Sequence, residues 1–387
     1  IKGLQFGQCD PEMEQNIMPA ISLLIKPASS SCNMRCAYCF YADVANRREI
    51  SNYGIMSEDM LETIIQKVFA YADSMASFGF QGGEPTLAGL DFFKKAVALQ
   101  KKYNTKHIRV HNAIQTNGLN IDDEWAAFFH ENHFLVGLSL DGTKPIHDKY
   151  RRDGAGNGTF DRVLEAAKRM ERHQVEFNIL STVNRDVAQN IDRIYYFFKK
   201  QGFSYLQFIP CLDELKFPGE KEYSLTPSLY GNFLKDLFRL WYVDLNTNHP
   251  VSIRYFDNLV MMIGGYPPES CGMAGSCSCY YMIEADGSVY PCDFYVTDEW
   301  RIGNVMTDGW EEMRQTETAR RFVEISRQVA KECRDCRYFM LCRGGCRRNR
   351  EPISMGQNTL NTLCPAFRSF FEYAADDLAK IARKFLR

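Results

Sequence analysis

The sequence predicts an α/β fold in which a sheet of parallel strands, covered by helices, is followed by a smaller cysteine-rich unit. Between residues 20 and about 210, six short apolar runs alternate with stretches that have helical periodicity. A segment rich in charge, Gly and Pro then interrupts the alternation. Beyond it, nine of the 14 cysteines crowd into residues 271–364, which indicates a unit with a different organisation.

The six apolar runs are rich in β-branched and aromatic residues, and such nearly continuous runs are typical of buried parallel strands. They predict strands at 21–26, 76–81, 108–115, 134–140, 175–183 and 204–210. Apolar residues at helical spacing predict helices at 57–73, 91–103, 160–173 and 186–201. A barrel and an open doubly wound sheet both fit this alternation.

Ligands of parallel sheets collect at the carboxyl ends of the strands, where the connecting loops open. Polar or small residues of interest follow several of the predicted strands: Cys32, Gly82, Thr116, Ser139 and Cys211. We therefore expect the chemistry of this protein to lie at that edge of the sheet.

The second half of the chain begins with a long amphipathic helix at 228–245, after which we place a boundary near residue 250. The stretch 280–296 then predicts a β-hairpin that turns at Asp286-Gly287. We expect three parts: residues 1–17, an extension whose origin the sequence does not identify, residues 18–250 and residues 251–387. The last part has little regular core and needs additional cross-links.

Charge and hydropathy exclude several classes of function. Lys and Arg number 46 against 48 acidic residues, a net charge of -2, so the surface as a whole does not attract nucleic acid or an anionic membrane. No apolar run approaches the ~20 residues that cross a bilayer, and no signal peptide is evident. We expect a cytoplasmic protein, and its 14 cysteines indicate metal binding because disulfides are rare in that compartment.

Three cysteines, Cys32, Cys36 and Cys39, follow the first predicted strand. Thiolates at such close spacings can hold three corners of a [4Fe-4S] cluster and leave the fourth iron open. An open coordination position is typical of a catalytic metal site. The alternatives are a zinc knuckle short of one ligand and a redox pair of Cys36 and Cys39. Structural zinc sites prefer four protein ligands, and no His follows at the spacing of a zinc motif.

The spacing CxxxCxxC, with Tyr38 and Phe40 around the third thiol, resembles the radical S-adenosylmethionine (SAM) superfamily, and "FQGGEPTL" at 80–87 resembles its GGEP motif. The resemblance implies a partial (β/α)6 barrel, in which SAM on the open iron is cleaved to a 5′-deoxyadenosyl radical. Glycines without a Cβ would let backbone carbonyls approach the SAM ammonium, and a guanidinium could bind the methionyl carboxylate. The implied SAM-binding residues are Tyr38, Gly82, Gly83, Glu84, Ser139, Arg151 and Leu212.

The cysteines of residues 271–364 exceed by one the eight ligands that two closed four-thiolate sites need. Their pattern resembles the SPASM domain, which carries two auxiliary [4Fe-4S] clusters. The resemblance assigns an inner cluster to Cys271, Cys277, Cys292 and Cys346, an outer cluster to Cys333, Cys336, Cys342 and Cys364, and no role to Cys279. Closed four-thiolate ligation implies electron transfer rather than substrate binding. Two structural zinc sites are the alternative.

The basic run "CRGGCRRNR" at 342–350 would by itself suggest a nucleic-acid surface. Arg beside anionic iron–sulfur clusters accounts for it as simply, and the net charge argues against nucleic acid.

Longer stretches, among them "MPAISLLIKPASSSCNMRCAYCFYAD", "CGMAGSCSC" and "DGSVYPCDFYV", resemble the anaerobic sulfatase-maturating enzymes over residues 18 to about 375. The resemblance implies oxidation of a Cys or Ser in a nascent sulfatase to Cα-formylglycine. The adenosyl radical would take hydrogen from the substrate Cβ, Asp293 would take the thiol or hydroxyl proton, and the electron would leave through the auxiliary clusters. Burial or a nearby anionic cluster should raise the pKa of Asp293 toward the working pH.

The expected partners are an unfolded or nascent sulfatase peptide and a reducing electron donor such as flavodoxin or ferredoxin, with the enzyme itself a monomer. A related SPASM enzyme that crosslinks or epimerises another ribosomal peptide is the nearest alternative. Such enzymes often carry an N-terminal leader-recognition domain, for which the residues before 18 are too few. A non-catalytic zinc-binding protein is a more remote alternative.

Overall fold

The computed structural model describes residues 19–214, 219, 221–247, 250–351 and 360–386, so the predicted extension 1–17 lies outside the described residues. Its strands form one ten-stranded sheet in the order β10-β9-β8-β1-β2-β3-β4-β5-β6-β7. The strands are β1 (Ala20–Ile25), β2 (Met75–Phe80), β3 (Arg109–Thr116), β4 (Phe134–Ser139), β5 (Phe177–Val183), β6 (Tyr205–Pro210), β7 (Ser252–Ile253), β8 (Met282–Ile283), β9 (Ser288–Tyr290) and β10 (Gly303–Asn304).

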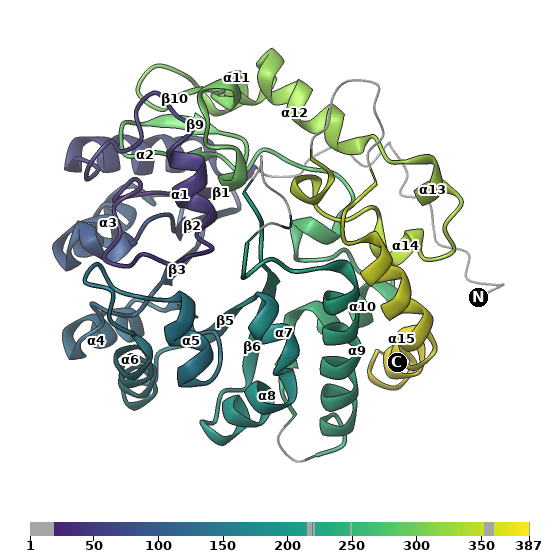
Figure 1. Ribbon diagram of the computed structural model, residues 1–387. Helices are drawn as coiled ribbons and strands as arrows, with labels where there is room; N and C mark the ends of the chain where they lie inside the picture. The colour runs from purple at the N-terminus through teal and green to yellow at the C-terminus, as the bar shows by residue number, and fades with distance from the viewer. Residues whose placement is uncertain (1–18, 215–218, 220, 248–249, 352–359, 387) are drawn as a thin grey trace.

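The first six strands are parallel, and each pairs with its neighbour in the sequence. This sequential order is that of a barrel, because a doubly wound sheet reverses its strand order at a switch point. The described sheet ends at β7 on one side and β10 on the other, so the barrel is partial, as predicted. Figure 1 shows the alternating helices along the outside of the curved sheet, from α2 and α3 round to α8 and α9. All six predicted strands are confirmed to within two residues.

Four helices of the barrel part begin with a polar side-chain cap, and the longer helices bury one apolar stripe. In α2 the Ser57 hydroxyl accepts a hydrogen bond from the Met60 amide, and Thr226 caps the long helix α9 in the same way. These helices are α1 (Phe40–Ala45), α2 (Glu58–Tyr71), α3 (Leu90–Tyr103), α4 (Asp123–Glu131), α5 (Lys144–Tyr150), α6 (Phe160–Arg172), α7 (Arg185–Gln189), α8 (Ile191–Lys200) and α9 (Pro227–Asp244). The prediction of a single helix at 186–201 is wrong in one respect, because Asn190 divides this segment into α7 and α8.

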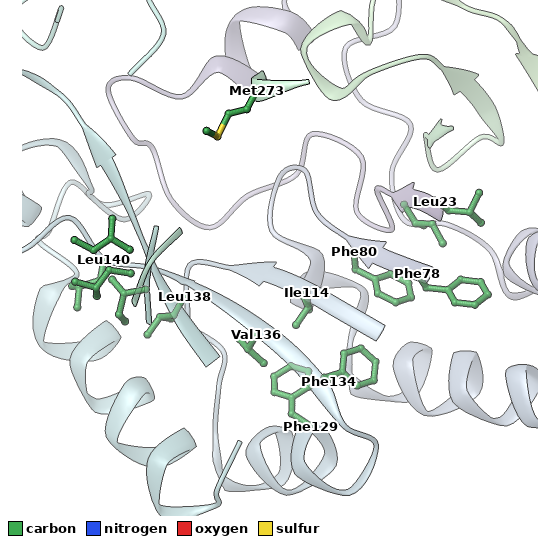
Figure 2. Packing of buried hydrophobic residues seen from close by; sticks show 14 of the residues in the cluster. Leu23, Phe78, Phe80, Ile114, Phe129, Phe134, Val136, Leu138, Leu140 and Met273 are labelled. Atoms are coloured by element: carbon green, nitrogen blue, oxygen red, sulfur yellow. The ribbon is translucent and has the colours of Figure 1, made fainter. Parts of the chain in front are cut away.

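The core lies between the sheet and the outer helices. On β2 and β4 alternate residues are buried, and their aromatic rings meet those of the helices outside them. The rings of Phe80 and Phe93 are 5.0 Å apart and those of Phe129 and Phe134 are 5.5 Å apart. Figure 2 shows Phe78, Phe80, Phe129 and Phe134 gathered in this layer. This packing fixes the strands and hence the loops at their carboxyl ends.

The predicted hairpin is confirmed, with β8 and β9 antiparallel about a turn at Gly287, whose φ of 82° suits glycine. The sequence did not predict where the hairpin would attach. Strand β8 pairs in parallel with β1, placing Met282 beside Leu24 and Ile283 beside Ile25. The cysteine-rich part therefore extends the edge of the barrel sheet itself.

The cysteine-rich part contains mostly short helices, apart from a long final helix that packs against α9 and α10 (Figure 1). Gly231 of α9 allows close approach, because a Cβ there would lie 3.2 Å from the Ala366 Cα. These helices are α10 (Arg254–Ile263), α11 (Trp310–Gln315), α12 (Glu317–Arg327), α13 (Lys331–Arg334), α14 (Phe339–Cys342) and α15 (Cys364–Phe385). Within the part of the chain that the structure describes, no helix is long and apolar enough to cross a membrane.

Candidate active site and metal centres

The loop after β1 carries the first three cysteines and ends where α1 begins, directly after Cys39. It is held against the end of α5 and the residues that follow: the Ala37 amide donates to the Tyr150 carbonyl at 3.0 Å, and the Arg35 amide to the Arg152 carbonyl at 2.7 Å. Burial raises the pKa of the Cys36 thiol to about 12. Three thiols thus lie on one short, anchored loop.

One hollow opens beside this loop, lined by residues from the loop, from α1 and from the segment after β6. Of the predicted site residues it brings together Cys36, Tyr38, Cys39 and Leu212, although the last is 173 positions from Cys39 in the sequence. Ser139 is not among its lining residues; it ends β4 and is buried. A molecule bound at the cysteine loop and extending into this hollow would contact Leu212.

Arg151 is fixed beside this loop by a buried aspartate that sequence reasoning missed. Its Nε donates to Asp141 Oδ2 at 3.0 Å, and its Nη1 lies 3.8 Å from Cys36 Sγ. Asp141 also accepts hydrogen bonds from the Tyr38 hydroxyl and, at 2.9 Å, from the Thr182 amide. Asp141 follows Ser139 in "LSLDG", so its place in a quoted motif was the available signal.

The turn after β2 packs against the cysteine loop. Gly83 has φ 58°, and a Cβ there would overlap with the backbone carbonyl of Ser31 and lie 2.9 Å from that of Ser29. A Cβ on Gly82 would meet the Lys26 side chain. The two glycines therefore permit loop-to-loop contact, a role that was not predicted for them.

Glu84 of the same turn is buried, and protein groups occupy both of its oxygens. Its Oε1 accepts hydrogen bonds from the Thr116 hydroxyl at 2.7 Å and from the Thr86 hydroxyl and amide, while its Oε2 accepts one from the Asn117 amide at 2.8 Å. Burial raises its pKa, and these four donors oppose the rise. Glu84 thus ties the loops after β2 and β3 together.

Asp293 lies where the cysteine-rich part meets the first two loops of the barrel. It is three residues beyond Tyr290, the end of β9, and its Oδ2 accepts hydrogen bonds from the Tyr41 hydroxyl at 3.3 Å and from Gln81 Nε2 at 3.2 Å. Its Oδ1 lies 3.4 Å from Cys292 Sγ. Burial raises the pKa of the Asp293 carboxyl, as expected. Sequence reasoning missed Tyr41 and Gln81, although both lie within quoted stretches.

A second buried charge cluster supports this region. Glu284 of the hairpin forms one ion pair with Lys26, which directly follows β1, and a second with Arg48 at 2.6 Å. All three side chains are almost fully buried, and the Lys26 ammonium lies 5.6 Å from the centre of the Tyr41 ring. The cluster links the hairpin to the loop that carries Tyr41.

A hollow in the cysteine-rich part has four cysteines in its lining, and these are the four assigned to the inner cluster: Cys271, Cys277, Cys292 and Cys346. Aromatic rings and two arginines complete its wall. Because Cys292 precedes Asp293, this hollow adjoins the buried carboxylate.

The four thiols assigned to the outer cluster lie on α13, on α14, at the start of α15 and on the turn between the first two of these. Burial raises the pKa of Cys342 to about 11, and the neighbouring thiols Cys364, Cys333 and Cys336 contribute to the rise. The outer four are therefore mutual neighbours. Cys279 packs against the apolar core, and Cys211 lies with three tyrosines.

The spacing of these thiols bears on the metal they could hold. Within the described ranges, no three His, Cys, Asp or Glu side chains come close enough to bind a single metal ion. A single zinc ion would draw four thiolates to about 2.3 Å from one centre. Thiols arranged around a hollow fit an iron–sulfur cluster, in which each thiolate binds a different iron.

Comparison with known proteins agrees with this geometry. Residues 27–188 match the radical SAM superfamily, and residues 271–337 match an iron-sulfur cluster-binding domain, SPASM. A cysteine-type anaerobic sulfatase-maturating enzyme of Clostridium novyi is 49% identical over 367 residues, which cover 95% of this chain and 98% of that protein. The chain belongs to the anaerobic sulfatase-maturating enzyme family.

Two further relatives of this family bear on the fold and on the substrate. A serine-type anaerobic sulfatase-maturating enzyme of Bacteroides thetaiotaomicron is 32% identical over 371 residues, which cover 91% of this chain and 89% of that protein. The solved structure of native anSMEcpe with bound AdoMet and Cp18Cys peptide superposes with a TM-score of 0.91 at 46% identity, covering 95% of this chain and 99% of that one. The predicted family, the radical SAM and SPASM fold, and the SAM and [4Fe-4S] cofactors are confirmed, and the zinc alternative is wrong.

Proposed function

We propose that this protein oxidises a cysteine of a sulfatase peptide to Cα-formylglycine, with Asp293 as the base. The observation that carries the proposal is the position of Asp293, buried between Cys292 of the inner hollow and two side chains, Tyr41 and Gln81, that adjoin the SAM motifs. A proton acceptor and an exit for one electron are neighbours there. Oxidation of a thiol-bearing carbon needs both.

The cofactors would be held by the residues that the geometry groups together. Cys32, Cys36 and Cys39 would hold the SAM-binding cluster, and the two sets of four thiols would hold the auxiliary clusters. When bound, SAM and its cluster supply the radical that takes hydrogen from the substrate Cβ. Arg151, oriented by Asp141, would bind the SAM carboxylate. Tyr38 and Leu212 line the hollow and would contact SAM there. Gly82 and Gly83 would position the neighbouring loops together with Glu84, and Ser139 would extend the pocket from the end of β4.

The two oxygens of Asp293 have different surroundings. Tyr41 and Gln81 both donate to Oδ2, and the thiol of Cys292 donates to Oδ1. A metal-bound Cys292 carries no proton, since only the thiolate is a ligand. In the loaded enzyme the thiol bond to Oδ1 would be absent, so that oxygen could accept the proton of the substrate thiol while the bonds from Tyr41 and Gln81 hold the carboxylate in place.

Cysteine rather than serine is the proposed target. The identity of 49% with a cysteine-type relative against 32% with a serine-type relative supports this assignment. The acid-base chemistry agrees, because a thiol with a pKa near 8.5 loses its proton to a carboxylate far more readily than an alcohol does.

We also propose residues 18–250 as the SAM-cleaving part and 251–387 as the auxiliary-cluster part, which the matches at 27–188 and 271–337 support. A reducing protein such as flavodoxin or ferredoxin would supply the first electron to a monomeric enzyme. Oxygen-sensitive clusters and reduced thiols favour action in the cytoplasm.

The test is an anaerobic assay of the iron-loaded enzyme with SAM, dithionite and two peptides that differ only in Cys or Ser at the target position. We expect an aldehyde, trapped by a hydrazine reagent, on the cysteine peptide, with far less on the serine peptide. Cleavage of SAM without any aldehyde on either peptide would contradict the proposal and favour a different peptide modification. Preference for the serine peptide would overturn the choice of target only.

A further inference from the structure

Two arginines of the basic run at 342–350 are buried in the wall of the inner hollow. Arg347 and Arg350 are each 2% exposed, and both lie on the short 3-10 helix η5 (Arg347–Arg350), which begins directly after Cys346. Charged side chains are almost never this buried unless they are paired. Their position therefore requires an explanation that a surface role in binding nucleic acid does not provide.

Arg350 is held rigidly by the end of α12. Its Nη1 donates to the Gln328 carbonyl at 2.7 Å, and its Nη2 donates to the Ser326 carbonyl at 2.8 Å. Both carbonyls belong to the C-terminal turn of that helix, where cations bind favourably. These two bonds fix the plane of the guanidinium at the hollow.

Arg347 is held in a different way. Its guanidinium lies 4.4 to 4.7 Å from the centres of three aromatic rings, and its Nη1 donates to the Phe322 carbonyl at 2.8 Å. A carboxylate is also near, because Glu351 lies 3.5 Å from its Nε. The charge of Arg347 is therefore partly balanced.

The charge of Arg350 is not balanced in this way. Among the described residues no carboxylate forms an ion pair with it, and its buried Nε donates no hydrogen bond. An unpaired buried cation and an unsatisfied N–H are both costly. An anionic group in the hollow would satisfy both.

The position of Arg350 relative to the thiols agrees with this. Arg350 lines the same hollow as the four inner thiols. Ser326, whose carbonyl accepts a hydrogen bond from Arg350, also accepts one from the Cys277 amide through its hydroxyl at 2.8 Å, so one residue connects Arg350 to a thiol of the inner set.

We propose that the buried charge of Arg350 raises the reduction potential of the inner auxiliary cluster and so favours its acceptance of an electron from the substrate. This inference rests on the proposed function. The substrate radical loses one electron and its thiol loses one proton; the proton goes to Asp293, and the cluster gains the electron. Because the reduced cluster carries one more negative charge, a fixed cation in a dry wall stabilises it relative to the oxidised form.

The test is a redox titration, followed by electron paramagnetic resonance, of enzyme in which alanines replace Cys32, Cys36 and Cys39, so that only the auxiliary clusters respond. In that background we compare Arg350→Gln and Arg350→Lys with a control, Arg327→Gln. Arg327 is an exposed arginine at the end of α12, the helix whose last carbonyls hold Arg350. We expect the glutamine variant to lower one midpoint potential, lysine to restore most of it, and the control to leave both potentials unchanged.

A fully iron-loaded Arg350→Gln variant with unchanged potentials would overturn the proposal. So would an equal loss in the lysine variant, because shape rather than charge would then matter. If the glutamine variant does not load iron, Arg350→Met, which keeps an unbranched apolar stem, is titrated in its place under the same criteria. The potentials require no substrate, so failure of the peptide assay would be distinguishable from failure of this inference.

Discussion

Gly83 packs directly against the carbonyl oxygen of Ser31, so that the turn after β2 touches the loop that leads to the first cysteine. The next residue strengthens the contact, since the Glu84 amide donates a hydrogen bond to the same carbonyl at 2.8 Å. The position of Cys32, one residue further along, thus depends on a glycine 51 positions away in the sequence.

Replacing Gly83 with alanine should displace the cysteine loop. The new Cβ would overlap with backbone and the residue would keep a positive φ, at a combined cost of ~3 kcal/mol. We expect a lower thermal unfolding temperature and loss of about one third of the iron, the share of one cluster in three. Gly54→Ala is the matched control, because that glycine also has positive φ but open space around it. Equal effects in both variants would contradict this explanation.

Asp141→Asn should weaken SAM binding. Asp141 fixes both Arg151 and Tyr38, and an amide cannot balance the guanidinium charge. We expect the SAM dissociation constant to rise at least about tenfold, which corresponds to ~1.4 kcal/mol. Equilibrium binding to the iron-loaded enzyme measures it, with Asp192→Asn, a half-exposed partner of Arg239, as control. Unchanged affinity would show that Arg151 does not depend on this carboxylate.

Asp293→Asn should separate SAM cleavage from oxidation of the peptide. The amide cannot take the thiol proton, so aldehyde formation should fall by about 10²–10⁴-fold, the usual contribution of a general base. Chromatography should still detect 5′-deoxyadenosine, because the three thiols and the SAM pocket are untouched. Tyr41→Phe, which removes one donor to Oδ2, should cause a smaller loss. Wild-type aldehyde yields from the asparagine variant would exclude Asp293 as the base.

Cys279, the one cysteine of residues 271–364 that was assigned to neither cluster, provides a control for the metal sites. Cys333→Ala should remove the outer cluster and lower the iron content from about 12 to about 8 atoms per chain. Cys279→Ala should leave it unchanged, since that thiol packs against the apolar core outside both sets. Iron and sulfide analysis after anaerobic reconstitution measures both variants. An equal loss in the two would show that the assignment of ligands is wrong.

His147 should make the fold sensitive to acid. It is fully buried, its Nδ1 accepts the Asp141 amide N–H at 3.3 Å, and burial lowers its pKa from 6.5 to about 3. Between these values the unfolded chain binds one more proton than the folded chain. Stability is therefore complete above pH 6.5 and is lost as the pH falls, by up to about 1.4 kcal/mol per pH unit.

Denaturant unfolding of the metal-free protein between pH 7.5 and pH 5 tests this expectation. His147→Asn keeps an amide near the same partners without a titratable group, so its slope against pH should be smaller. Parallel slopes in the two proteins would contradict the assignment to His147.

The strands were predictable because they depend on local pattern, since apolar runs identify β1 to β6. The division of the cysteines into an inner and an outer set came instead from the resemblance to the SPASM domain, because Cys346 of the inner set lies within the run that holds Cys333, Cys336 and Cys342 of the outer set. Asn190 shows the limit for helices: a residue that interrupts an otherwise continuous periodic run divides α7 from α8. Such breaks depend on tertiary packing, which outweighs local propensity.

The contacts around Asp293 were not predictable for a different reason. Tyr41 and Gln81 meet it across 252 and 212 positions of sequence, and nothing in their local pattern marks them as partners of a carboxylate. The same holds for Asp141, whose role depends on the burial of Arg151 beside it. A sequence motif identifies residue types, but only the fold shows which side chains converge.

The pairing of β8 with β1 joins the two halves of the chemistry by backbone hydrogen bonds, with the Lys26 amide donating to the Ile283 carbonyl at 2.9 Å. A hinge between the cysteine loop and the inner hollow would have to break this ladder and the buried Lys26–Glu284 ion pair. In the proposed mechanism, the distance over which an electron must tunnel would therefore be set at folding rather than by substrate-driven closure.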